Sequence, residues 1–179
     1  GTANDPTLMF GGVGGIFEWI NDPSVAQLDV RDFLGKIPVD QVSSPTRKSY
    51  GDLTFRWMDA GVKEMFLTQW VFEETTGCLF TSDTYGFRHL NSANAPPVID
   101  STGDLPTVDF VAKEFAARIN WLPGANFPDV IARLDSLFEE LDVQMIAPVH
   151  GCVLKGRDVV AEHVALSIKA LEAASSLPV

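Results

Sequence analysis

Hydrophobic and polar residues alternate through the middle of the chain. Leu53–Met58 and Met65–Phe72 both follow a period of two, which predicts two strands with one face buried. The polar stretch Glu73–Gly77 predicts a hairpin turn, and Cys78–Ser82 predicts the returning strand. Asp83 follows directly, so we expect its carboxylate at the end of that strand.

Later in the chain the hydrophobic pattern changes to a helical period. Asp109–Trp121 and Phe127–Leu141 place apolar residues at helical spacing, and Arg157–Ser176 predicts a final amphipathic helix. Val143–Ala147, which precedes the last of these helices, is apolar except at Gln144 and predicts a buried strand that ends at Pro148.

Other segments carry weaker patterns. Gly14–Ile20 predicts a short helix, Val25–Val30 a strand and Asp32–Lys36 a helical turn. Pro38–Gly51 is polar and turn-rich, and Asn91–Thr107 predicts a long surface loop. The order of elements indicates a mixed α/β (α+β) fold, and the length fits one domain over residues 1–179.

Charge and composition narrow the classes of function. The 13 Lys and Arg against 24 Asp and Glu give a formal charge of −11, which disfavours binding to a nucleic-acid backbone. No apolar run is long enough for a membrane span, and no leader pattern precedes the first elements, so we expect a cytoplasmic protein. Cys78 and Cys152 lie in apolar stretches and are expected as buried thiols in a reducing compartment. Core or interface positions are expected for the tryptophans, Trp19, Trp57, Trp70 and Trp121.

Three residues at or near predicted strand ends carry candidate chemistry. Asp83, His150 and Glu64 offer carboxylate and imidazole groups, which suit iron or zinc. The structural alternative is that Asp83 and His150 hydrogen-bond to one another or to nearby backbone. His89 is a candidate to line a pocket near Asp83, whereas His163 is expected to be structural or solvent-facing on the final helix.

Two segments carry a resemblance to a known family. Leu79–Gly86 ends a strand with an aspartate followed by a small residue, an aromatic residue and glycine, and Met145–Gly151 ends a strand with Ala-Pro-x-His-Gly. They resemble the metallo-β-lactamase superfamily and, within it, the flavodiiron and oxygen-binding diiron branch. Phe115–Asn120, which leads into Phe127–Leu141, is similar to the same branch. The resemblance implies an αββα sandwich.

The resemblance also implies roles for particular residues. Asp83 matches the carboxylate that bridges two metals, His150 matches the last histidine ligand, and Glu64 falls by spacing at the middle histidine. The family's His-x-(His or Glu)-x-Asp-His-x-Gly motif falls on residues that are not metal ligands: Thr7, Met9, Gly11 and Gly12. Because paired cations repel unless many anionic and imidazole ligands hold them, Glu64, Asp83 and His150 are expected to hold one iron or zinc ion at most.

The front of the chain differs from the family in another way. Several strands normally precede the segment matching Thr7–Gly15, and almost none precede it here. We therefore expect a shortened domain or a fragment, with an open sheet edge covered by a homo-oligomeric partner or a companion segment.

Three functions remain open, and whether the protein is an enzyme stays open with them. The first is a domain with an impaired metal site and a binding or structural role. The second is an iron-dependent oxidoreductase or a sensor of O2 or NO, in which an oxidoreductase would need FMN from a partner. The third is a hydrolase that uses one metal at Glu64, Asp83 and His150.

Overall fold

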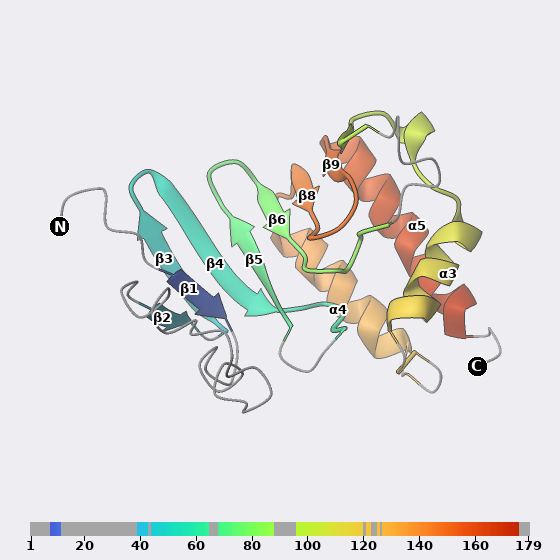
Figure 1. Ribbon diagram of the computed structural model, residues 1–179, viewed down its shortest axis with the longest axis horizontal. Helices are drawn as coiled ribbons and strands as arrows, with labels where there is room; N and C mark the ends of the chain where they lie inside the picture. Colours follow the sequence, from blue (N-terminus) through green and yellow to red (C-terminus); the bar gives the residue numbers. More distant parts are fainter. Residues whose placement is uncertain are drawn as a thin grey trace, which may run out of the picture.

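The computed structural model describes residues 8–11, 39–42, 44–64, 68–87, 96–119, 121–122, 125 and 127–175. Within these residues a seven-stranded mixed sheet has the order β3-β4-β5-β6-β8-β9-β7 (Figure 1). Its strands are β3 (Thr46–Tyr50), β4 (Leu53–Asp59), β5 (Gln69–Glu73), β6 (Cys78–Phe80), β7 (Val98–Ile99), β8 (Met145–Ala147) and β9 (Val153–Lys155). A separate parallel pair joins β1 (Leu8–Gly11) to β2 (Val39–Val42).

The helices gather at the C-terminal half of the sheet, on the right in Figure 1. They are the short 3-10 helix η1 (Thr102–Asp104) and the α-helices α3 (Val108–Arg118), α4 (Phe127–Glu140) and α5 (Arg157–Ser175). Thr107 caps α3, because its hydroxyl accepts a hydrogen bond from the Phe110 N–H at 3.3 Å. Pro128 occupies the first turn of α4, where its missing N–H costs no helical hydrogen bond.

The core forms where alternate strand residues meet the helices. Trp70, Leu79 and Ile146 are fully buried on neighbouring strands of the sheet, and Leu134 of α4 and Leu171 of α5 are buried with them in one cluster. Alternate residues are buried on the strands, and residues at helical spacing are buried on α5. Both patterns agree with the sequence prediction.

The turn between β5 and β6 is held by one carboxylate. The Glu73 side chain accepts hydrogen bonds from the backbone N–H groups of Thr75 and Thr76, both at 2.8 Å. The Thr76 hydroxyl also donates to this carboxylate, and these hydrogen bonds lower the pKa of Glu73 to about 2. The predicted hairpin at Glu73–Gly77 is therefore confirmed, with its stabilising group at the last residue of β5.

Several elements agree with the sequence and others correct it. The predicted strand at Leu53–Met58 and the three predicted C-terminal helices are confirmed within a few residues. The prediction that Pro38–Gly51 is turn-rich was wrong, because β2 and β3 lie there. Strand β3 is the edge of the seven-stranded sheet and carries charged residues, so its sequence lacks the hydrophobic alternation of a central strand.

The predicted loop over Asn91–Thr107 was also wrong in part. The described portion contains β7 and η1, and β7 pairs in parallel with β9. Strand β9 itself was not predicted. Both strands are only two or three residues long, too short for periodicity to reveal them.

Some predicted features lie outside the described residues. These are the helix at Gly14–Ile20 with its Trp19, the strand at Val25–Val30, the helical turn at Asp32–Lys36, and His89. Cys78 and Cys152 are both buried thiols, as expected. In the described part of the chain, no helix combines the length and the hydrophobicity that crossing a bilayer requires.

Candidate functional site

Asp83 and His150 meet at one edge of the sheet. Strands β6 and β8 are parallel neighbours, so the loops that follow them leave the sheet on the same side. His150 Nε2 lies 3.5 Å from Asp83 Oδ1. Both side chains reach solvent, with 68% of the His150 and 37% of the Asp83 side chain exposed. The structure thus brings together the two residues that the sequence motifs singled out.

The loop that carries Asp83 is tightly wound. The Thr81 hydroxyl donates to the Thr84 carbonyl at 2.6 Å, and the Thr84 N–H donates back to the Thr81 carbonyl at 3.2 Å. Ser82 and Tyr85 adopt positive φ values of 55° and 65°, which are uncommon for residues with a Cβ. Such backbone strain persists only where surrounding contacts over-determine the conformation, so this loop is built to hold one shape.

Two glycines allow the loops to interlock. A Cβ on Gly86 would lie 2.4 Å from the His150 carbonyl oxygen, and a Cβ on Gly151 would lie 2.5 Å from the Phe87 carbonyl oxygen. Gly151 also has a φ of +95°. Because each glycine faces the backbone of the other loop, both motif glycines serve the approach of one loop to the other.

Glu64 lies beside this loop but is engaged elsewhere. Its Oε1 accepts a hydrogen bond from the Thr84 hydroxyl at 2.6 Å. The Val62 carbonyl lies 3.2 Å from the same hydroxyl, so the segment after β4 is joined to the Asp83 loop through Thr84. Glu64 therefore supports the neighbour of Asp83, and its other oxygen, Oε2, is buried without a hydrogen-bond partner among the described residues.

An aromatic layer underlies the loop. Tyr85 and Phe87 are buried, and both rings contact His163 of α5, with ring centroids 5.9 and 5.6 Å from the imidazole. His163 is fully buried, and burial lowers its pKa to about 4, so the imidazole is neutral near pH 7. Of the two expectations for His163, the structural one is confirmed and the solvent-facing one is wrong.

Arg118 at the end of α3 reaches the same loop. Its guanidinium donates to the Asp83 carbonyl at 3.2 Å and forms an ion pair with Glu114 one turn earlier. The sequence did not indicate the contact between Arg118 and Asp83, because only the tertiary packing of α3 brings its last residue to the loop after β6. The only local signal is the i, i+4 spacing of Glu114 and Arg118.

The donor set at this edge decides which metal site it fits. Two ligands about 2.1 Å from one ion lie about 3 to 3.5 Å apart, so the Asp83–His150 separation suits a shared single ion. Among the described residues, however, no three His, Cys, Asp or Glu side chains gather in an arrangement that could hold a metal. The described residues therefore do not fit a pair of metals, and the ligand roles of Asp83, His150 and Glu64 remain predictions.

No family profile and no curated protein sequence matches the chain. Solved structures do match. Rubredoxin oxygen:oxidoreductase from Desulfovibrio gigas matches with a TM-score of 0.58 and 18% identity, over 87% of this chain and 37% of that protein. A point mutant of the flavo di-iron protein from Thermotoga maritima matches with a TM-score of 0.55 and 16% identity, over 82% of this chain and 34% of that protein.

A third match is the chemotaxis sensor ODP, described as a peroxy diiron species, with a TM-score of 0.50 and 14% identity over 90% of this chain and 70% of that protein. This chain has the same metallo-β-lactamase-like α/β fold as these diiron proteins, which confirms the predicted fold class. It spans about a third of the length of the two larger structures.

Proposed function

We propose that this chain is a metallo-β-lactamase-fold domain with an impaired metal site, which acts as a binding or structural module. The proposal depends on how the three candidate ligands are placed. Glu64 is hydrogen-bonded to Thr84, and among the described residues at this sheet edge only Asp83 and His150 face each other. In the sequence, the ligand motif of the diiron branch falls on Thr7, Met9, Gly11 and Gly12, none of which carries a carboxylate or imidazole.

The loops support this reading because contacts within the protein hold their backbone. The interlocked glycines fix the approach of the Asp83 and His150 loops, and the Thr81–Thr84 hydrogen bonds fix the turn at Asp83. A fold held this way can lose ligands without losing the shape of the edge.

Metal content after equilibration provides the test. Purified protein is incubated separately with Fe(II), Zn(II) and Mn(II), passed through a desalting column, and measured by mass spectrometry of the metals. We expect less than one ion per chain for each metal. Two ions per chain would overturn the proposal and favour the oxidoreductase or sensor, for which an iron-dependent absorbance change on adding oxygen would be the next measurement.

A single-metal site is the second candidate, and the 3.5 Å separation of Asp83 and His150 favours it. In that case one ion per chain binds, and Asp83→Asn and His150→Gln each abolish its uptake. Asp59→Asn, which changes an exposed carboxylate paired with Lys63, is the matched control and leaves uptake unchanged. A hydrolase would also lose turnover with the first two variants and keep it with the third.

We further propose that a second copy of the chain or a companion segment pairs with an open edge of the seven-stranded sheet. Within the described residues the edges are β3 and β7. Strand β3, with five residues, is the longer of the two and offers more backbone groups for pairing. Sedimentation of the purified chain measures self-association directly, and a monomer at all concentrations leaves only the companion segment.

A further inference from the structure

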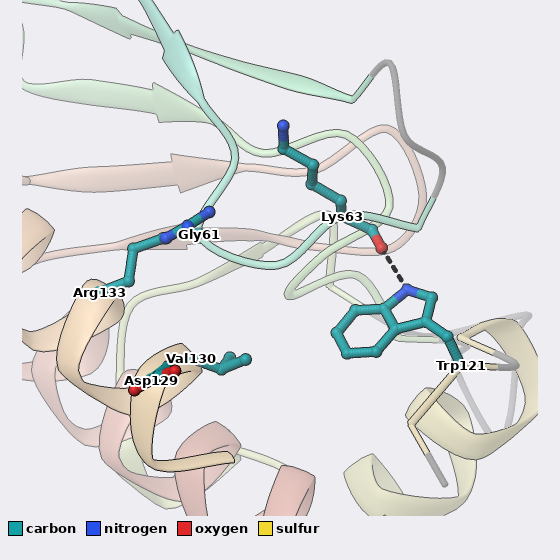
Figure 2. A pocket seen from close by; sticks show the side chains of 6 residues that line it. All are labelled: Gly61, Lys63, Trp121, Asp129, Val130 and Arg133. Carbon is teal, nitrogen blue, oxygen red and sulfur yellow. Dashed lines mark hydrogen bonds between the residues drawn. The ribbon is translucent and has the colours of Figure 1, made fainter. Parts of the chain in front are cut away.

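A small hollow lies beside the Asp83 loop, between the segment after β4 and the first turns of α4 (Figure 2). Its volume is about 230 Å³. Six residues line it: Gly61, Lys63, Trp121, Asp129, Val130 and Arg133. None of them is a candidate metal ligand, so the lining of the hollow does not include the Asp83–His150 pair.

One wall is a flat apolar surface held in place. The indole Nε1–H of Trp121 donates to the Lys63 carbonyl at 2.6 Å, which fixes the ring without covering its face. Trp121 is 37% exposed, which is unusual for the largest side chain, and Figure 2 shows the edge of its six-membered ring directed toward the side chain of Val130. The wall is therefore preorganised for a planar ligand group.

The base of the hollow requires a glycine. A Cβ on Gly61 would lie 2.5 Å from Leu134 Cδ2 and 3.1 Å from Trp70 Cη2, so the backbone there sits directly on the core. This close packing makes the base of the hollow rigid.

The opposite wall carries an unpaired cation. Arg133 extends from α4 toward Gly61 and makes no hydrogen bond or ion pair within the described residues. Lys63 adds a second positive charge, which the Asp59 carboxylate balances in an ion pair at 3.2 Å. Asp129 places one negative charge on the rim. Because Asp59 pairs with Lys63, Arg133 is the cation of this hollow that is available to an anionic ligand.

We propose that the hollow binds a small organic anion, a carboxylate or phosphate monoester attached to a planar apolar group. The anionic head pairs with Arg133, whose guanidinium can donate two parallel hydrogen bonds to such a group. The planar part lies against the Trp121 indole. Drug-sized ligands fill about 300 to 1,000 Å³, so the ligand here is a compact molecule of one ring.

The position of the hollow places its ligand next to the candidate site. The segment Gly61–Glu64 lines the hollow on one side and holds Thr84, the neighbour of Asp83, on the other. The proposal nevertheless does not depend on a metal at Asp83 and His150, because its ligand contacts are Arg133 and Trp121.

Titration with defined probes tests the proposal. Benzoate and phenyl phosphate are the anionic planar probes, benzyl alcohol is the neutral planar probe, and inorganic phosphate is the anion without a ring. Binding is followed by the indole N–H signals in ¹H–¹⁵N NMR spectra of the full chain, with the Trp121 signal identified from Trp121→Phe. We expect benzoate or phenyl phosphate to give a saturable shift of the Trp121 signal, and at least tenfold weaker binding for benzyl alcohol and for inorganic phosphate.

Variants separate the two halves of the site. Arg133→Gln removes a charge-assisted hydrogen bond and should weaken binding roughly ten- to a hundredfold, whereas Arg133→Lys keeps the charge and should weaken it less. Arg157→Gln, which changes an exposed cation at the start of α5 that pairs with Asp142 and does not line the hollow, is the matched control and should leave binding unchanged.

Four results would overturn the proposal. One is no saturable shift up to about 20 mM of either anionic probe, a range that covers the weakest specific affinities. Another is equal binding of benzoate and benzyl alcohol, and a third is equal binding of phenyl phosphate and inorganic phosphate. The fourth is unchanged affinity in an Arg133→Gln variant whose circular dichroism matches that of the original chain.

Discussion

The two candidate regions of this molecule differ in what holds them. The Asp83–His150 edge has an over-determined backbone, with two interlocked glycines and two residues at positive φ, yet few metal-binding side chains among the described residues. The hollow at Trp121 and Arg133 is lined by an indole and a guanidinium, and none of the candidate metal ligands is among its lining residues. The comparison teaches that loop shape and site chemistry are separate properties, because backbone contacts maintain the first and individual side chains supply the second.

The variant with the largest expected effect disrupts the close approach of the Asp83 and His150 loops. Gly151→Ala places a Cβ 2.5 Å from the Phe87 carbonyl and imposes a positive φ on a residue with a side chain. We expect it to lower the free energy of unfolding by about 3 to 4 kcal/mol, measured by urea denaturation, because strain and overpacking add.

Gly156→Ala is the matched control for that variant. Gly156 has a φ of +106° but no atom within 4 Å of the added Cβ, so it should show only the conformational cost of about 1 to 2 kcal/mol. Equal losses in the two variants would mean that the loops do not depend on their close approach.

A second effect concerns the aromatic layer beneath the edge. His163 has a pKa of about 4 in the fold against about 6.5 when unfolded, so the unfolded chain binds its proton first. Stability should therefore be unaffected above about pH 6.5 and should fall as the pH drops from about 6.5 to about 4, by up to about 3 kcal/mol from this group.

His163→Leu removes that proton and isolates its contribution. The variant should lose stability less steeply than the original chain between about pH 6.5 and pH 4, as measured by urea denaturation at several pH values. Parallel curves for the two proteins would show that the acid sensitivity comes from other groups, such as the carboxylates.

The smallest expected effect distinguishes the hollow from the edge. Arg133 is exposed and unpaired within the described residues, and glutamine is a good helix former, so Arg133→Gln should change the free energy of unfolding by less than about 0.5 kcal/mol. Thermal denaturation monitored by circular dichroism measures it. A large loss would mean that Arg133 serves the packing of α4 instead of a ligand.

The sequence alone determined the elements that have strong local periodicity. The strand at Leu53–Met58 and helices α3, α4 and α5 were predictable, because each repeats its burial pattern over enough residues to be read. Asp83 and His150 were predictable as a pair because both motifs end strands. The short strands β7 and β9 and the edge strand β3 were not, because brief or charged strands are recognised only by the neighbour they pair with.

Only the tertiary structure decided how the chemistry is distributed. Glu64 was selected by its spacing from Asp83, but the fold turns its carboxylate to Thr84. Trp121 and Arg133 are separated in sequence from Lys63, and no periodicity relates the three. They line one hollow because α4 packs its first turns against the segment after β4 and Trp121 hydrogen-bonds to the Lys63 carbonyl. Long-range contacts of this kind depend on the packing of the whole chain, so local sequence patterns carry no signal for them.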